Sequence, residues 1–137
     1  MPAPSNARQP GFHFRLATFD GGRRLIWIWQ EARALVKDIY GDFGSDTHAE
    51  RDYGFRGQIQ TAGISIMNNI AEGFERSTDP DKARFLDVAK GSAGEVRSMY
   101  YLAEDIRYVS GNIAHQRREK VIKISKGIAT LTAHFRQ

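Results

Sequence analysis

The chain has 137 residues, of which 41% are hydrophobic and 26% charged, and its formal net charge at pH 7 is +4. This length fits a single domain with one core, and the absence of cysteine excludes disulfides and cysteine-based zinc sites. No run approaches the ~18 consecutive apolar residues of a membrane span, and MPAPSNARQPGFHF at the N-terminus lacks the apolar core of a signal peptide. We therefore expect a cytoplasmic protein with no membrane partner.

Composition and charge change along the chain. Residues 1–18 are rich in Pro, Ser and Asn, and we expect them to form a flexible arm before a helical domain at 19–137. Residues 41–82 carry eight acidic against four basic side chains, whereas 111–137 carry six basic against one acidic. The middle of the chain is therefore acidic and its last quarter basic.

Apolar residues that recur with the 3.6-residue period of a helix predict a first amphipathic helix. It ends near Tyr40, because Gly41 and Gly44 follow as stop signals. The acidic, glycine-rich residues 41–52 then predict a loop. The core face of this helix is expected to hold Leu25, Ile28, Trp29, Ala32, Leu35, Val36 and Ile39.

The same period predicts a second helix from about residue 53 to residue 72, with Gly73 as the residue that ends it. Its core face is expected to hold Phe55, Ile59, Ala62, Gly63, Ile66 and Ile70.

The stretch Ser77-Thr78-Asp79-Pro80 is typical of a helix start, because capping side chains precede a proline in the first turn. It predicts a third helix that runs to about Tyr108, with Leu86 pointing sideways. Its core face is expected to hold Phe85, Val88, Ala89, Ser92, Val96, Met99, Ala103 and Ile106.

A fourth helix is expected from about residue 112 to residue 135. Its core face is expected to hold Ile113, Val121, Ile124, Ile128, Leu131 and Phe135. Four helices of roughly 18–28 residues joined by mostly short connections predict an all-α, antiparallel up-down-up-down four-helix bundle.

Some residues fall outside these core faces. At ~100° per residue, Ile26 and Trp27 point away from the core face of the first helix. Gly91, Gly94 and Tyr101 lie on the reverse of the third helix. Glycine inside a helix costs ~1 kcal/mol relative to alanine, which is easier to tolerate where another backbone approaches. Self-association through these residues is one interpretation, and a broad core face is the other.

Patterns of catalytic and metal-binding residues are scarce. None of the four histidines follows a glutamate by three residues, as in di-iron bundles, and no HExxH, Walker A, GxGxxG or GxSxG motif occurs. An active site would have only Asn69, Glu72 and Glu95 to use. We therefore expect a protein that is not an enzyme and that holds no metal or cofactor.

The fourth predicted helix carries a basic run that Glu119 alone interrupts with an acidic residue. Clustered Lys and Arg release condensed counterions when they bind the phosphates of RNA or DNA. A solvated helix face is the alternative interpretation, and an oligomer would multiply the phosphate contacts. The candidate nucleic-acid-binding residues are Arg117, Arg118, Lys120, Lys123 and Lys126.

The stretch SIMNNIAEGFER at 65–76 places amides and a carboxylate within an apolar run. Asn69 falls at the edge of the core face, and Glu72 lies one turn further along. Half-buried amides need hydrogen-bond partners, and Glu95 and Arg76 are the candidates. We expect Asn69 and Glu72 to tie the end of the second helix to a neighbour.

This stretch also carries a family resemblance. Together with the preceding QIQTAGI and the following ARFLDVAKGSAGEV, it resembles the four-helix-bundle proteins encoded in intervening sequences of bacterial 23S ribosomal RNA genes. WQEARALVKDIY at 29–40 is similar to the opening of that family, and the resemblance covers about residues 19–110. The signature positions map onto Asn69, Glu72, Gly73, Phe74, Arg76, Arg84, Phe85, Gly91, Ser92 and Glu95.

The resemblance implies a small all-α bundle whose relatives assemble as ring-shaped homopentamers and carry no enzymatic activity. Similar bundles act as accessory proteins of diversity-generating retroelements, where they bind nucleic acid and a reverse transcriptase. Met67 stands where relatives usually have proline, and Asn68 where they usually have serine. Two functions stay open: an oligomer that binds nucleic acid, and a structural scaffold that binds only protein partners.

Overall fold

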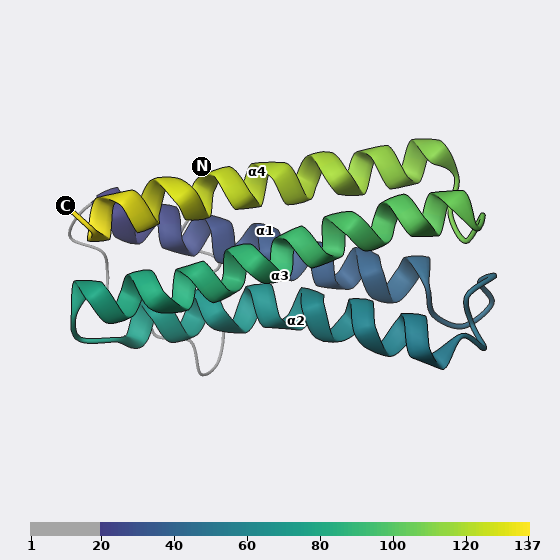
Figure 1. Cartoon of the computed structure of the whole chain (residues 1–137), viewed down its shortest axis with the longest axis horizontal. Coiled ribbons are helices and arrows are strands. Elements are labelled where there is room, and N and C mark those ends of the chain that lie inside the picture. The colour runs from purple at the N-terminus through teal and green to yellow at the C-terminus, as the bar shows by residue number, and fades with distance from the viewer. Residues whose placement is uncertain (1–19) are drawn as a thin grey trace.

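The computed structural model describes residues 20–137, which form four α-helices and contain no strand (Figure 1). The predicted arm at 1–18 lies outside the described residues. None of the four helices is long and apolar enough to cross a membrane. The helices are α1 (Asp20–Asp42), α2 (Tyr53–Glu75), α3 (Asp79–Asp105) and α4 (Gly111–Phe135).

Successive helices run in opposite directions (Figure 1). α1 and α3 each pack against both α2 and α4, so the four helices surround one core. The connections at 76–78 and 106–110 are short, and the longest connection is the loop at 43–52. The prediction of an all-α four-helix bundle is therefore confirmed, and the first loop begins two residues later than expected.

The helix starts follow from the local sequence. Asp52, Thr78 and Ser110 cap α2, α3 and α4, and each accepts a hydrogen bond from a backbone N–H three residues further on. These bonds satisfy N–H groups that have no partner within the helix. α2 continues two residues past Gly73, where the prediction ended it. A Cβ at Gly73 would lie 3.3 Å from the Lys82 carbonyl oxygen, so this glycine allows the backbone of α3 to approach.

The predicted core faces of α1, α2 and α4 are confirmed, because nearly all of their residues are buried. The exceptions are Val36 and Ile113, which are half-buried. Apart from Ala114, the described buried hydrophobic residues form one cluster between the helices.

The predicted core face of α3 is partly wrong. Leu86, expected to point sideways, is fully buried, whereas Val88 and Ile106, expected in the core, are 47% and 44% exposed. Tyr100 is fully buried and was not predicted. Half of the buried residues of α3 are alanines, which mark a core face only weakly, so the larger residues biased the prediction. These alanines are Ala83, Ala89, Ala93 and Ala103.

The prediction that Ile26 and Trp27 point away from the core is also wrong. Both are half-buried and pack against the core of the same protomer. Gly127 on α4 makes room for α1, because a Cβ there would lie 2.6 Å from Ile28 Cγ2 and 3.5 Å from Trp27 Cζ3. α1 packs between two neighbouring helices, and its buried face is therefore wider than a single stripe.

Candidate nucleic-acid interface

The five cations predicted on α4 do not form one free strip. Arg117, Arg118 and Lys120 are paired with carboxylates from other helices, whereas Lys123 and Lys126 are exposed. The paired and the exposed cations have different physical roles.

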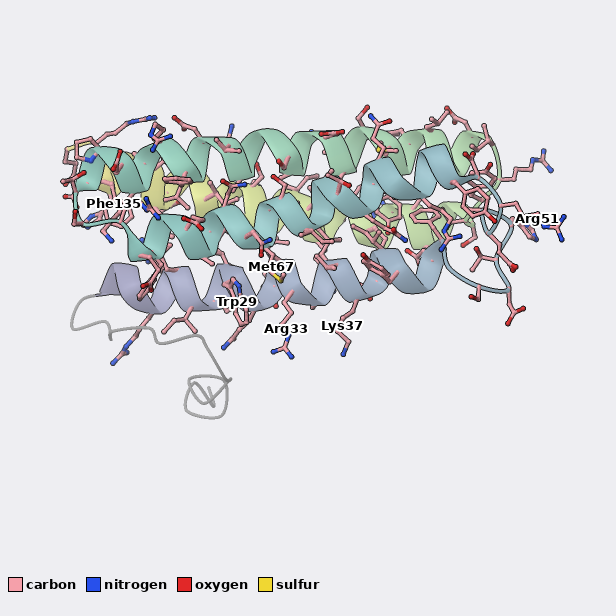
Figure 2. The ribbon with its side chains drawn as sticks, turned by 90° about the horizontal axis from the view of Figure 1, so that it is seen from below. Trp29, Arg33, Lys37, Arg51, Met67 and Phe135 are labelled. Carbon is pink, nitrogen blue, oxygen red and sulfur yellow. The ribbon has the colours of Figure 1, made fainter. Side chains whose placement is uncertain are left out.

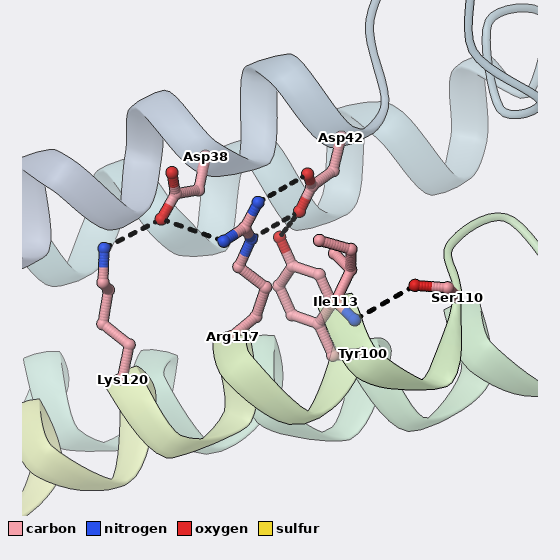
Figure 3. A network of polar contacts seen from close by, with 7 residues as sticks. All are labelled: Asp38, Asp42, Tyr100, Ser110, Ile113, Arg117 and Lys120. Atoms are coloured by element: carbon pink, nitrogen blue, oxygen red, sulfur yellow. Dashed lines mark hydrogen bonds and ion pairs between the residues drawn. The ribbon is translucent and has the colours of Figure 1, made fainter.

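Arg117 and Lys120 belong to a polar network that joins α1, α3 and α4 (Figure 3). Arg117 Nε and Nη2 donate to the two carboxylate oxygens of Asp42 at 2.8 and 2.9 Å. Tyr100 Oη donates to Asp42 Oδ2 at 2.8 Å. Asp38 Oδ2 accepts from Lys120 Nζ at 2.9 Å and lies 3.7 Å from Arg117 Nη1.

Two members of the network, Tyr100 and Arg117, keep their protons over a wide range of pH. Burial and the neighbouring Asp42 carboxylate raise the pKa of Tyr100 well above its usual value. The hydrogen bonds to Asp42 raise the pKa of Arg117. Tyr100 therefore stays a donor, Arg117 stays a cation, and their contacts tie three helices together.

Arg118 is neutralised in a different way. Its Nη1 donates to Glu104 Oε1 at 2.8 Å, and only 12% of its side chain is exposed. Its guanidinium carbon lies 4.1 Å from the centroid of the Tyr101 ring. Arg118 therefore supports an aromatic ring at the surface rather than presenting a free charge.

Lys123 and Lys126 keep their charge at the surface. Lys123 is 61% exposed, and its Nζ lies 3.9 Å from Glu31 Oε1, a long ion pair. The same Nζ lies 5.1 Å from the Trp27 ring centroid. The ammonium of Lys126 has no hydrogen bond or ion pair within the described part of the chain.

The structure adds two cations that the sequence prediction missed. Lys90 and Arg97 on α3 line a groove of about 260 Å³ between α3 and α4, opposite Lys126. Like Lys126, their charged groups have no partner among residues 20–137. The remaining lining residues are Ala93, Gly94, Val121, Ile122 and Ser125. The seven-residue spacing of Lys90 and Arg97 indicates a shared face, but only the packing brings that face beside Lys126.

The expected tie through Asn69 exists, but it is indirect. Asn69 Nδ2 donates to the backbone oxygen and to the hydroxyl of Ser65 on its own helix, at 2.8 and 3.0 Å. The Ser65 and Ser92 hydroxyls are 2.7 Å apart and link α2 to α3. Asn69 therefore orients Ser65, which makes the contact between helices.

Glu72 forms an exposed pair with Arg76, four residues further on, at 2.7 Å. Arg76 then reaches α3, with its guanidinium carbon 4.9 Å from the Phe85 ring centroid. Glu95 accepts from Gln58 Nε2 at 3.3 Å. Asn69, Glu72 and Glu95 thus make separate contacts.

The side chain of Lys82 caps the C-terminal end of α2. Lys82 Nζ donates to the carbonyl oxygen of Phe74 at 3.0 Å, and desolvation lowers the pKa of Lys82. Arg84 lies over the Phe85 ring at 4.5 Å. Lys82, Phe74, Arg76 and Phe85 therefore link the end of α2 to the start of α3.

The remaining candidate interface residues lie at the outer surface of α3. A Cβ placed on Gly91 or Gly94 would meet no atom within 4 Å, and Tyr101 is 50% exposed. Within residues 20–137, no group of three or more His, Asp or Glu side chains could hold a metal ion.

A four-helix core tied by ion pairs, with a basic groove at its surface, defines a small all-α bundle protein. The sequence profile of the family described as 23S rRNA-intervening sequence protein matches residues 25–130. The chain belongs to this family. The match extends past residue 110, where the resemblance described above ended. None of the curated proteins compared with the chain matches it.

Proposed function

We propose that the chain is a non-catalytic, oligomeric bundle that binds RNA or DNA through phosphate contacts. The observation that carries this proposal is the groove between α3 and α4, where Lys90, Arg97 and Lys126 have no carboxylate partner among the described residues. Lysine and arginine side chains without a partner can replace the counterions condensed on a polyanion, and no ion pair within the protein has to break first. Lys123, one turn from Lys126, lies outside this groove and lines a second hollow with Lys126, Glu31 and Glu119.

The paired cations of α4 are weaker candidates. Arg117 and Lys120 would have to leave Asp38 and Asp42 before they could bind phosphate, and the bundle would lose contacts between its helices. The pair of Arg117 and Asp42 is largely buried, and removing one partner of such a pair is strongly destabilising. The phosphate-binding surface is therefore assigned to the groove and not to the whole basic run of α4.

The test is the salt dependence of nucleic-acid binding. For each phosphate contact, the logarithm of the association constant falls by ~0.9 per decade of salt on duplex DNA and by ~0.7 on a single strand. Lys126→Gln should reduce this slope by about one contact. Lys120→Gln is the matched control: it should leave the slope unchanged and lower the stability of the bundle. Absence of binding even at low salt would refute the proposal.

Self-association has its own support on α3. Of the six exposed large hydrophobic residues in the described part, three lie on this helix and a fourth, Ile106, is its C-cap residue. Val88, Leu102 and Ile106 share a stripe with Gly91, and this stripe is rotated by about 125° around the helix from the edge at the groove. Apolar side chains beside a glycine suit close packing of two helices. We assign the contact between copies to this stripe, so that it leaves the groove free.

Light scattering of Leu102→Glu, with Asp105→Glu on the same helix as control, tests this surface. The expected result is a fall toward the 15.5 kDa mass of one protomer for Leu102→Glu alone. An unchanged mass would exclude the stripe. An oligomer that binds no nucleic acid would favour the alternative function, a scaffold for protein partners.

A further inference from the structure

Tyr101 continues the line of groove residues along α3. Lys90, Gly94, Arg97 and Tyr101 are spaced by four, three and four residues, which places them on one edge of the helix. At 1.5 Å per residue, the distance from Lys90 to Tyr101 along the axis is about 16 Å. On α4, Arg118 lies four residues before Ile122, which lines the groove. The pair of Tyr101 and Arg118 therefore stands at one end of the groove.

Arg118 covers one face of the Tyr101 ring, and the other face is open to solvent. The Arg118 guanidinium lies against one face of the ring, at 4.1 Å from the centroid, and is itself fixed by Glu104. Half of the Tyr101 surface is nevertheless exposed. Because one face is covered and half of the surface is free, the other face is accessible to a planar ligand.

We infer that the groove takes a single-stranded nucleic acid, with its phosphates beside Lys90, Arg97 and Lys126 and one base stacked on the open face of Tyr101. This inference rests on the proposed function and specifies its ligand. A positive groove beside an aromatic platform is the arrangement by which proteins bind single strands without sequence preference. Gly94 and Ser125 are small, and they leave room for the backbone between the cations.

A duplex would use only part of this surface. Its bases are already stacked on one another inside the helix, so Tyr101 would gain no stacking partner. A single strand uses both the cations and the ring. The structure therefore assigns a preference for single strands, and Tyr101 is the residue that creates it.

Fluorescence anisotropy with two labelled probes tests the preference. The probes are an oligothymidylate of about 12 nucleotides, within the usual range of site sizes, and a hairpin duplex with the same number of phosphates. Tyr101→Ala should weaken binding of the single strand by about 5- to 150-fold, the fold-change that corresponds to the loss of one stacked base. Tyr101→Phe keeps the ring and should bind as the unchanged protein does.

Tyr40→Ala on α1 is the matched control, because Tyr40 is 47% exposed and lies away from the groove. It should leave both affinities unchanged. If Tyr101→Ala has no effect, or if the duplex binds as tightly as the single strand, the inference is overturned and the proposed function stands. If neither probe binds at low salt, both are overturned.

A second measurement uses the unmodified protein and so does not depend on any substitution. Photo-crosslinking of a bromouridine-substituted single strand should label the tryptic peptide SMYYLAEDIR, residues 98–107. Tyr100 in this peptide is fully buried, so the adduct should lie on Tyr101. Adducts confined to other peptides would overturn the inference.

Discussion

The ion pair between Asp42 and Arg117 allows a direct test of what holds the bundle together. Asp42→Asn keeps the shape of the side chain and removes the charge that Arg117 contacts through two hydrogen bonds (Figure 3). The two side chains are only 11% and 17% exposed. The substitution therefore leaves a guanidinium in a site that water barely reaches.

The expected magnitude follows from this burial. Removal of one partner from a buried ion pair costs about 3–5 kcal/mol, because the other charge stays behind without compensation. Asp38, at 3.7 Å from Arg117, still offers a carboxylate, so the loss should be near the lower end, about 3 kcal/mol. For a domain of this size, that corresponds to a fall of about 10 °C in the melting temperature.

Urea denaturation at one fixed protein concentration measures the loss, since association would otherwise add to the apparent stability. Asp46→Asn is the matched control. Asp46 is exposed, and asparagine tolerates its positive φ of 62°. The control should change the free energy of unfolding by less than about 0.5 kcal/mol. If Asp42→Asn costs less than about 1 kcal/mol, the pair is effectively solvated and the reasoning fails.

Two further predictions concern packing and pH. Gly127→Ala should lower the free energy of unfolding in urea, because crowding against Ile28 costs about 1–3 kcal/mol and the gain in helix propensity is ~1 kcal/mol. Gly57→Ala on α2, which meets open space, should raise it by about that gain, and equal effects of the two would contradict the packing argument. The hydrogen bond from Tyr108, aided by the backbone N–H of Phe55, lowers the pKa of Asp52 in the folded protein. The stability that Asp52 contributes is therefore fully present above the unfolded pKa of about 3.9. It is lost as the pH falls through the lower pKa of the folded state. Tyr108→Phe should flatten this acid loss in denaturation curves recorded between about pH 6 and pH 2, and an unchanged acid limb would show that the bond has no such effect.

The fold could be predicted where the sequence carries strong contrast. On α2, isoleucines alternate with polar residues at helical spacing, and all six predicted core positions are buried. On α3, alanine forms much of the buried face, and the larger Val88 and Ile106 lie outside it. Hydrophobicity thus located α3 but located its core-facing side only in part, since four of the eight predicted residues are buried.

The candidate interface was harder to predict, because its decisive feature is the partner of each charge. Arg117 and Asp42 are 75 residues apart in the sequence, and nothing local indicates that they meet. Lys90 and Arg97 share a helix face, yet the groove exists only because α4 brings Lys126 to that face. The positions of the cations can therefore be read from the sequence, but the packing of the helices determines which of them are paired with carboxylates.

The pairing also explains why α1 tolerates acidic residues at its end. Asp42 is the last residue of α1, whose final turn holds no cation of its own. A negative charge at a helix C-terminus is unfavourable by about 0.3–1 kcal/mol because it opposes the helix dipole. Arg117 reaches this end from the antiparallel α4 and supplies the missing positive charge.

Part of the basic run of α4 therefore pairs with the carboxylates at the C-terminal end of α1 and is not available to a ligand. Figure 2 shows Arg33 and Lys37 pointing away from the bundle on α1, where both are exposed and neither belongs to the ion pairs between α1 and α4. Arg33→Gln with Lys37→Gln consequently removes two charges without touching the core or the groove. If this double variant weakens nucleic-acid binding as much as Lys90→Gln with Arg97→Gln, the binding responds only to total charge. A loss confined to the groove variant is the expected result, because free cations from two helices converge there.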